Sequence, residues 1–194
     1  QPELAIEALR QAVELRGDDS DQFWLGLAYV KNGQPDKAIA PLRQAVELRG
    51  AAIDQHWLGA AYIDNNQPDK AIEPLQNAVE LCGDDSDQHC LGIAYVENGQ
   101  PDMAIEPFRQ AVELHGNGED QHWLGVAYVK NGQPDMAIEP LRQTVELRGD
   151  DSDQHWLGVA YVKNGQPDIA IEPFRQAVEL SGTAIDQHWL GVAY

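Results

Sequence analysis

Cysteine, methionine and basic residues are scarce in this chain of 194 residues. It contains two cysteines, two methionines and 13 lysines and arginines, against 32 aspartates and glutamates. The formal net charge is -19 at pH 7 and the sequence pI is about 4.4. Because nucleic acids and anionic membrane surfaces are themselves polyanions, this charge argues against both as partners.

Long apolar runs are also missing. None approaches the about 18–20 residues that a membrane-spanning helix needs, and no basic start leads into an apolar stretch, so no secretory signal is visible. Cys82 and Cys90 belong to no CxxC pair or spaced cluster. We therefore expect two thiols rather than a disulfide, and a reducing compartment, the cytoplasm.

One period of 33 residues accounts for every tryptophan and tyrosine. The tryptophan lattice has one vacant point, which Cys90 fills; its members are Trp24, Trp57, Trp123, Trp156 and Trp189. The tyrosines follow five residues later in each unit: Tyr29, Tyr62, Tyr95, Tyr128, Tyr161 and Tyr194. Periods of this length are typical of stacked repeats, which predicts an all-α solenoid of helix–turn–helix units.

Residues 18–50 illustrate one unit. Asp18 is a suitable N-cap for a first helix, and Asp21 can complete a capping box. The aspartates equivalent to Asp21 recur in every unit, so we interpret them as helix starts and not as catalytic acids. Gly26 lies inside this helix, where its recurrence predicts a close approach of the partner helix. Asn32-Gly33 ends the helix.

The second helix of the unit opens at Gln34-Pro35-Asp36, with proline at the first helical position. It ends at Gly50 and carries an internal proline, Pro41, at which we expect a kink. Its apolar face is formed by Ala38, Ile39, Leu42, Ala45, Val46 and Leu48.

These residues resemble the tetratricopeptide repeat family. The matching register is Leu25-Gly26, Tyr29, Gly33, Ala38, Leu42 and Ala45, and it repeats over essentially the whole chain. The resemblance implies a right-handed α-solenoid, a superhelix of stacked antiparallel helix–turn–helix repeats. Residues 1–194 would form a single array of about six units, starting on a second helix and ending within a first helix.

Three departures from the family pattern stand out. Each unit is one residue short, Gly50 replaces a proline near the unit end, and the large aromatic lies two residues late, with Gln22 in its usual place. The last departure leaves open whether the tryptophans pack between helices or reach the groove.

The resemblance also implies a concave face lined by first helices, on which a peptide would bind. The positions that map to it form three rows. The first is Phe23, His56, His89, His122, His155 and His188; the second is Leu27, Ala60, Ile93, Val126 and Val159; the third is Lys31, Asp64, Glu97, Lys130 and Lys163.

The five aligned histidines raise the question of a metal site. No cysteine or carboxylate obviously completes a ligand set in the sequence, so we predict neither a metal nor another cofactor. The alternatives are a residue copied by duplication, or a His-lined peptide groove that is sensitive to pH.

No phosphate-binding loop, HExxH motif or nucleophile elbow occurs, so no enzyme is predicted. We expect a protein-interaction scaffold whose partner is a basic or amphipathic protein or peptide. The alternative is a structural solenoid, engineered or near-consensus, that stacks head-to-tail without a dedicated ligand. Residues 189–194 would offer an apolar end to the Gln1–Arg16 helix of another copy.

Overall fold

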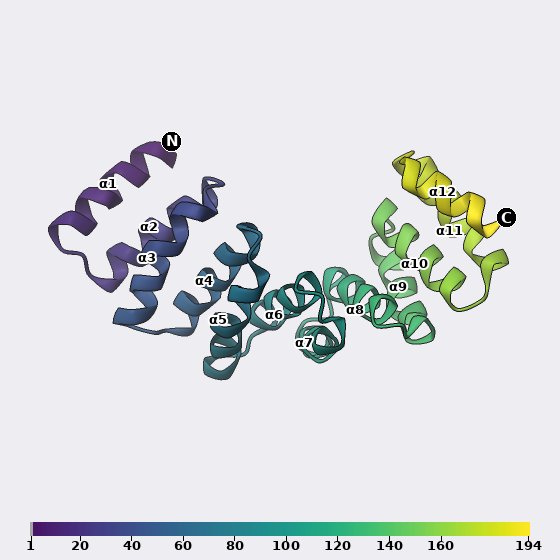
Figure 1. The fold of residues 1–194 in the computed structure, drawn as a ribbon, viewed down its shortest axis with the longest axis horizontal. Helices are drawn as coiled ribbons and strands as arrows, with labels where there is room; N and C mark the ends of the chain where they lie inside the picture. Colours follow the sequence, from purple (N-terminus) through teal and green to yellow (C-terminus); the bar gives the residue numbers. More distant parts are fainter. Residues whose placement is uncertain (1) are drawn as a thin grey trace. The chain divides into compact units, whose positions relative to one another are not determined.

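The structure, a computed structural model, describes residues 2–194 and contains twelve α-helices and no strand within them (Figure 1). First and second helices alternate, as the sequence predicted. The first helices are α2 (Asp19–Lys31), α4 (Ala52–Asp64), α6 (Asp85–Glu97), α8 (Gly118–Lys130), α10 (Asp151–Lys163) and α12 (Ala184–Ala193). The second helices are α1 (Pro2–Leu15), α3 (Pro35–Leu48), α5 (Pro68–Leu81), α7 (Pro101–Leu114), α9 (Pro134–Leu147) and α11 (Pro167–Leu180).

The helices form two compact units, residues 1–98 with α1 to α6 and residues 99–194 with α7 to α12. Within each unit, every helix packs against the helices that precede and follow it in the sequence. First helices of neighbouring repeats also touch: α4 contacts α6, and α10 contacts α12. Each unit is therefore a stack of helix–turn–helix repeats, the all-α solenoid that the period predicted.

Side chains at the predicted caps start most first helices. Asp18 accepts a hydrogen bond from the backbone N–H of Asp21 at 2.8 Å, and Asp84, Asn117, Asp150 and Thr183 do the same in their repeats. Ala51 has no side chain for this bond. The helices end where the chain turns left-handed, at Gly33 with φ 66°, or at Asn66 with φ 55° where a repeat lacks the glycine.

The core of each repeat lies where the first helix meets its second helix. Leu42, Leu75 and Leu141 are fully buried against the glycine of the preceding first helix. A Cβ added at Gly26 would lie 2.4 Å from Cγ of Leu42, so only glycine admits this approach. This confirms the close packing that the recurring glycine predicted.

The second helices run through their internal prolines without interruption. Helix α3 extends from Pro35 to Leu48 although Pro41 lies inside it, and Pro41 is buried. No helix among residues 2–194 is both long enough and apolar enough to cross a membrane.

Candidate functional site

Hydrogen bonds between histidines and aspartates join the first helices of neighbouring repeats. Nδ1 of His56 lies 2.8 Å from Oδ1 of Asp87, and Nδ1 of His122 lies 2.7 Å from Oδ1 of Asp153. His155 and Asp186 form the same bond at 2.6 Å. Each pair spans 31 residues, so each bond links one repeat to the next. We call these contacts the His–Asp joints.

The aspartate of each joint has a second neighbour, the residue five positions earlier in the chain. Where this residue is arginine, its guanidinium pairs with the carboxylate, as in Arg16–Asp21 at 2.7 Å and Arg49–Asp54 at 2.5 Å. The hydrogen bond to Asp54 raises the pKa of Arg49. The aspartates themselves are almost completely buried, so each needs such donors to offset the loss of water.

Asp186 shows this balance most clearly. Burial raises the pKa of its carboxyl, but hydrogen bonds from Thr183, His155 and Ser181 outweigh burial and hold the pKa below its ordinary value. The donor–acceptor distances are 2.5 Å from Thr183, 2.6 Å from His155 and 3.1 Å from Ser181. The carboxylate is thus kept ionised inside the protein.

The role assigned to these aspartates from the sequence was incomplete. Their backbone N–H groups donate to the capping side chains as expected. At Ala51 the backbone N–H donates to Oδ2 of Asp54 at 3.1 Å. The capping box predicted at Asp18 and Asp21 has only its first half, and the Asp21 carboxylate accepts from Arg16. The main partners of these carboxylates lie at the joints between repeats.

The three predicted rows differ in how much surface they offer. In the first row Phe23 and His122 are buried, the histidines at 56, 89 and 155 are half-buried and His188 is exposed. In the second row Leu27, Val126 and Val159 are buried and Ala60 and Ile93 are half-buried. All five residues of the third row are exposed: Lys31, Asp64, Glu97, Lys130 and Lys163.

Phe23 shows what happens where the histidine is missing. It cannot donate a hydrogen bond to Asp54, and the Arg49 guanidinium lies over its ring at 5.6 Å while binding that carboxylate. The joint is then held by a cation–π contact and an ion pair instead of a His–Asp hydrogen bond.

Hollows lie beside the His–Asp joints, at the N-terminal ends of the first helices. The one between α4 and α6 has a volume of about 400 Å³ and is lined by Ala52, Ile53, His56, Trp57, Cys82, Asp84, Ser86 and Asp87. A smaller one of about 190 Å³ lies between α10 and α12 and is lined by Asp151, Ser152, His155, Thr183, Ile185 and Asp186. The two hollows occupy equivalent positions, three repeats apart in the sequence.

The sequence prediction included His56 and His155 but missed the exposed isoleucines that line the hollows with them. Ile53 and Ile185 are exposed by 47% and 63% and hold the same repeat position as Ser20, Ser86, Glu119 and Ser152. Variation at one position of otherwise similar repeats is the signal that could have identified it.

The tryptophans pack between repeats and also reach the surface. The ring of Trp123 stacks on Phe108 of the preceding second helix, with centroids 6.2 Å apart, and Trp189 stacks on Phe174 at 6.0 Å. Trp57 is half-buried and lines the larger hollow. The displaced aromatic therefore packs between helices, and whether it also reaches the concave face stays a prediction.

Comparisons with solved structures find the same fold. YrrB, a tetratricopeptide repeat protein with an unusual peptide-binding site, has 22% identity and a TM-score of 0.80, over 95% of this chain and 98% of YrrB. MamA has 26% identity and a TM-score of 0.74, and the match covers 81% of this chain and 95% of MamA. A Podosopora anserina protein with nearly identical TPR-like repeats has 29% identity and a TM-score of 0.69, and the match covers 84% of this chain and 94% of that protein.

No curated protein sequence matches the chain. Family models described as tetratricopeptide repeat match residues 1–56, 25–86 and 91–153, and a further one matches residues 154–183. Members of this family are generally non-enzymatic scaffolds for protein–protein interaction. The matches extend over most of the sequence and agree with the fold, so the chain belongs to the tetratricopeptide repeat family.

Proposed function

We propose that this protein is an interaction scaffold that binds a basic or amphipathic peptide or protein segment on the concave face lined by first helices. The observation that carries the proposal is the recurring hollow between neighbouring first helices. In the larger hollow the apolar side chains of Ile53 and Trp57 lie beside the carboxylates of Asp84 and Asp87. An apolar pocket with acidic neighbours suits a side chain that is both apolar and cationic.

Charge supports the same partner chemistry. The net charge of -19 favours encounter with basic segments and disfavours acidic ones. The smaller hollow is lined by Asp151 and Ile185 among others, which repeats the combination of a carboxylate and an aliphatic side chain. Each hollow would therefore accept a side chain that is both apolar and cationic.

Peptide binding is known in this fold, since YrrB is described as having an unusual peptide-binding site. In the present chain the exposed third row, with Lys31 and Asp64 among its members, would add polar contacts at the other end of the first helices. The buried residues of the first two rows would shape the face from below. The half-buried histidines would be reached only at their edges.

The test is a screen of immobilised basic amphipathic peptides, followed by titration of the best binder into the variant Ile53→Ser/Ile185→Ser. Serine occupies this position in other repeats, so the fold should tolerate it. Loss of the apolar contact at each hollow should weaken binding at that hollow about ten-fold or more.

The matched control is Met103→Lys, which changes an exposed second-helix side chain to the lysine found in equivalent repeats. It should leave peptide affinity unchanged. Failure of every basic amphipathic peptide to bind would refute the proposed function. If the double isoleucine variant binds the peptide as tightly as wild type, the hollows are not the peptide-binding sites.

A second candidate function is self-association of copies into longer stacks. Apolar side chains are exposed on α12 and next to it, with Val192 at 48%, Tyr194 at 76% and Ile185 at 63%, and Leu4 of α1 is exposed by 65%. Docking of these faces between copies would bury apolar surface. Static light scattering should then show mass growing with concentration and Val192→Asp should suppress the growth; a strict monomer at high concentration would eliminate this candidate.

A further inference from the structure

The joint at Asp87 differs from those around it in its second neighbour. Arginine precedes the joint aspartate by five residues at Arg16, Arg49 and Arg148, and the guanidinium lies within 4 Å of the carboxylate in each case. Between α5 and α6 the residue at this position, five before Asp87, is Cys82. The buried carboxylate of Asp87 therefore lacks the guanidinium that Asp21, Asp54 and Asp153 have.

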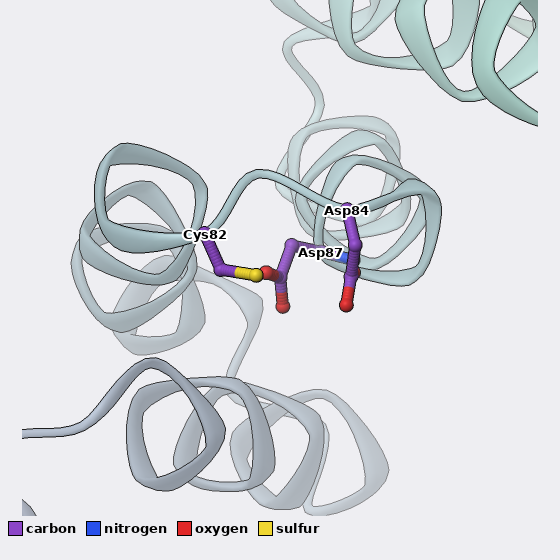
Figure 2. Close-up of side chains that lie close together, drawn as sticks. All are labelled: Cys82, Asp84 and Asp87. Atoms are coloured by element: carbon purple, nitrogen blue, oxygen red, sulfur yellow. The ribbon is translucent and has the colours of Figure 1, made fainter.

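Three side chains at this joint offer ligand atoms to one point. The Sγ of Cys82 and carboxylate oxygens of Asp84 and Asp87 all lie within 4.8 Å of one another. Figure 2 shows the thiol of Cys82, at the end of α5, directed toward the Asp87 carboxylate at the start of α6. The three groups also line the hollow of about 400 Å³, so an ion has both space and access.

The Asp87 carboxylate has one oxygen available for such an ion. Asp87 is only 3% exposed, and the hydrogen bond that it accepts among the described residues comes from Nδ1 of His56 to Oδ1. Oδ2 has no hydrogen-bond donor there, whereas Oδ2 of Asp54 accepts from Arg49 and from the backbone of Ala51. Asp87 lines the hollow, so a cation that enters the hollow can reach this oxygen and supply the positive charge that the carboxylate lacks.

We propose that Cys82, Asp84 and Asp87 bind a thiophilic divalent cation, of which Zn²⁺ is the representative. Zn²⁺ combines sulfur and carboxylate oxygen ligands, and three protein ligands leave a fourth position for water. The thiol of Cys82 releases its proton to solvent as the metal–sulfur bond forms, and no oxidation state changes. The ion takes the place that the guanidinium holds beside Asp21, Asp54 and Asp153.

His56 is a positioning residue in this site. Its hydrogen bond to Oδ1 fixes the orientation of the Asp87 carboxylate, and it belongs to the preceding repeat. Partners of this kind commonly change metal affinity about 10–100-fold without touching the ion. Metal binding at α5 and α6 would thus be coupled to the joint with α4.

Cobalt provides the direct test, because Co²⁺ replaces Zn²⁺ and a cobalt–thiolate bond gives a charge-transfer band in the near ultraviolet. Titration of the full chain with Co²⁺ should produce this band with one ion per chain, and Zn²⁺ should abolish it. Cys82→Ser should eliminate the band, and Asp87→Asn should weaken Co²⁺ binding more than 100-fold, beyond the effect of an outer partner. The control Cys90→Ser, which keeps Cys82, should retain it.

Two further variants separate the metal site from a purely structural effect. Cys82→Arg introduces the residue that stands beside Asp21, Asp54 and Asp153. This variant should show no band and should melt at a higher temperature than the metal-free wild type. His56→Phe copies Phe23; it should keep the band while Zn²⁺ affinity falls about 10–100-fold. The proposal is overturned if wild type gives no band, if Cys90→Ser loses it, or if Cys82→Arg binds Co²⁺ as tightly as wild type.

Discussion

The buried carboxylate at each joint lies between two neighbouring side chains, and the identity of these residues decides which hydrogen bonds it accepts. The preceding first helix supplies histidine, or Phe23, which donates no hydrogen bond, and the end of the second helix supplies arginine, cysteine, histidine or serine. Asp153 shows how fine the balance is, because its Oδ2 is buried without a hydrogen bond while Nε of Arg148 stands 3.7 Å away. Stability at this scale depends on donor identity.

Asp186→Asn tests the contribution of an ionised joint carboxylate. Because the folded pKa of Asp186 is lowered, its stabilisation is present above the ordinary value of 3.8 and is lost as pH falls through the lower folded pKa. The variant should therefore lose about 1–3 kcal/mol near pH 7, and the difference from wild type should shrink as the pH falls below 3.8. Urea unfolding followed by circular dichroism at several pH values measures this. An equal difference at all pH values would contradict an ionised role.

Gly125→Ala tests the close approach of the two helices of a repeat. The new Cβ would lie 2.4 Å from Cγ of the fully buried Leu141, so overpacking of about 1–3 kcal/mol should exceed the helix-propensity gain of about 1 kcal/mol. Gly191→Ala is the matched control, since nothing lies within 4 Å of its Cβ position. Thermal unfolding should show a lower midpoint for the first variant and an equal or higher one for the second. The reverse order would argue against the packing described.

At the scale of the helix, the repeats offer a natural comparison of capped and uncapped starts. Ala51 has φ -70° and ψ 153°, close to the -74° and 170° of Asp18, yet it has no capping side chain. Ala51→Asp should therefore stabilise the protein by about 0.5–2 kcal/mol, and Asp18→Ala should cost a similar amount. The melting temperature should shift by about 2–4 °C per kcal/mol, in opposite directions for the two variants. A fall in Ala51→Asp would show that repulsion from Asp54 exceeds the capping gain.

For the whole molecule, the net charge of -19 is the dominant electrostatic quantity. Self-repulsion of this charge opposes folding, and salt screens it over a shorter distance as concentration rises. Raising NaCl from about 10 mM to about 150 mM should increase the melting temperature. The same increase in KCl would identify screening as the cause, and a decrease would show that the Arg–Asp pairs outweigh the net charge.

The helices and their packing were largely predictable, because each signal lies within one repeat. The cap at Asp18, the proline at Pro35 and the left-handed Gly33 fix the helix limits by local hydrogen bonding and backbone sterics. Gly26 and Leu42 belong to the same repeat, so their contact follows from the fold of a single hairpin. The candidate site was less predictable, because its residues come from two repeats.

The sequence by itself determined the period, the two helices of each unit and the family to which the chain belongs, since all of these depend on neighbours along the chain. The tertiary structure decided what the repeated side chains do. It placed His56 against Asp87, left Trp57 partly buried beside the hollow and brought Cys82 close to Asp84 and Asp87. These contacts depend on the angle at which successive repeats stack, and that angle comes from packing between side chains that no local pattern brings together.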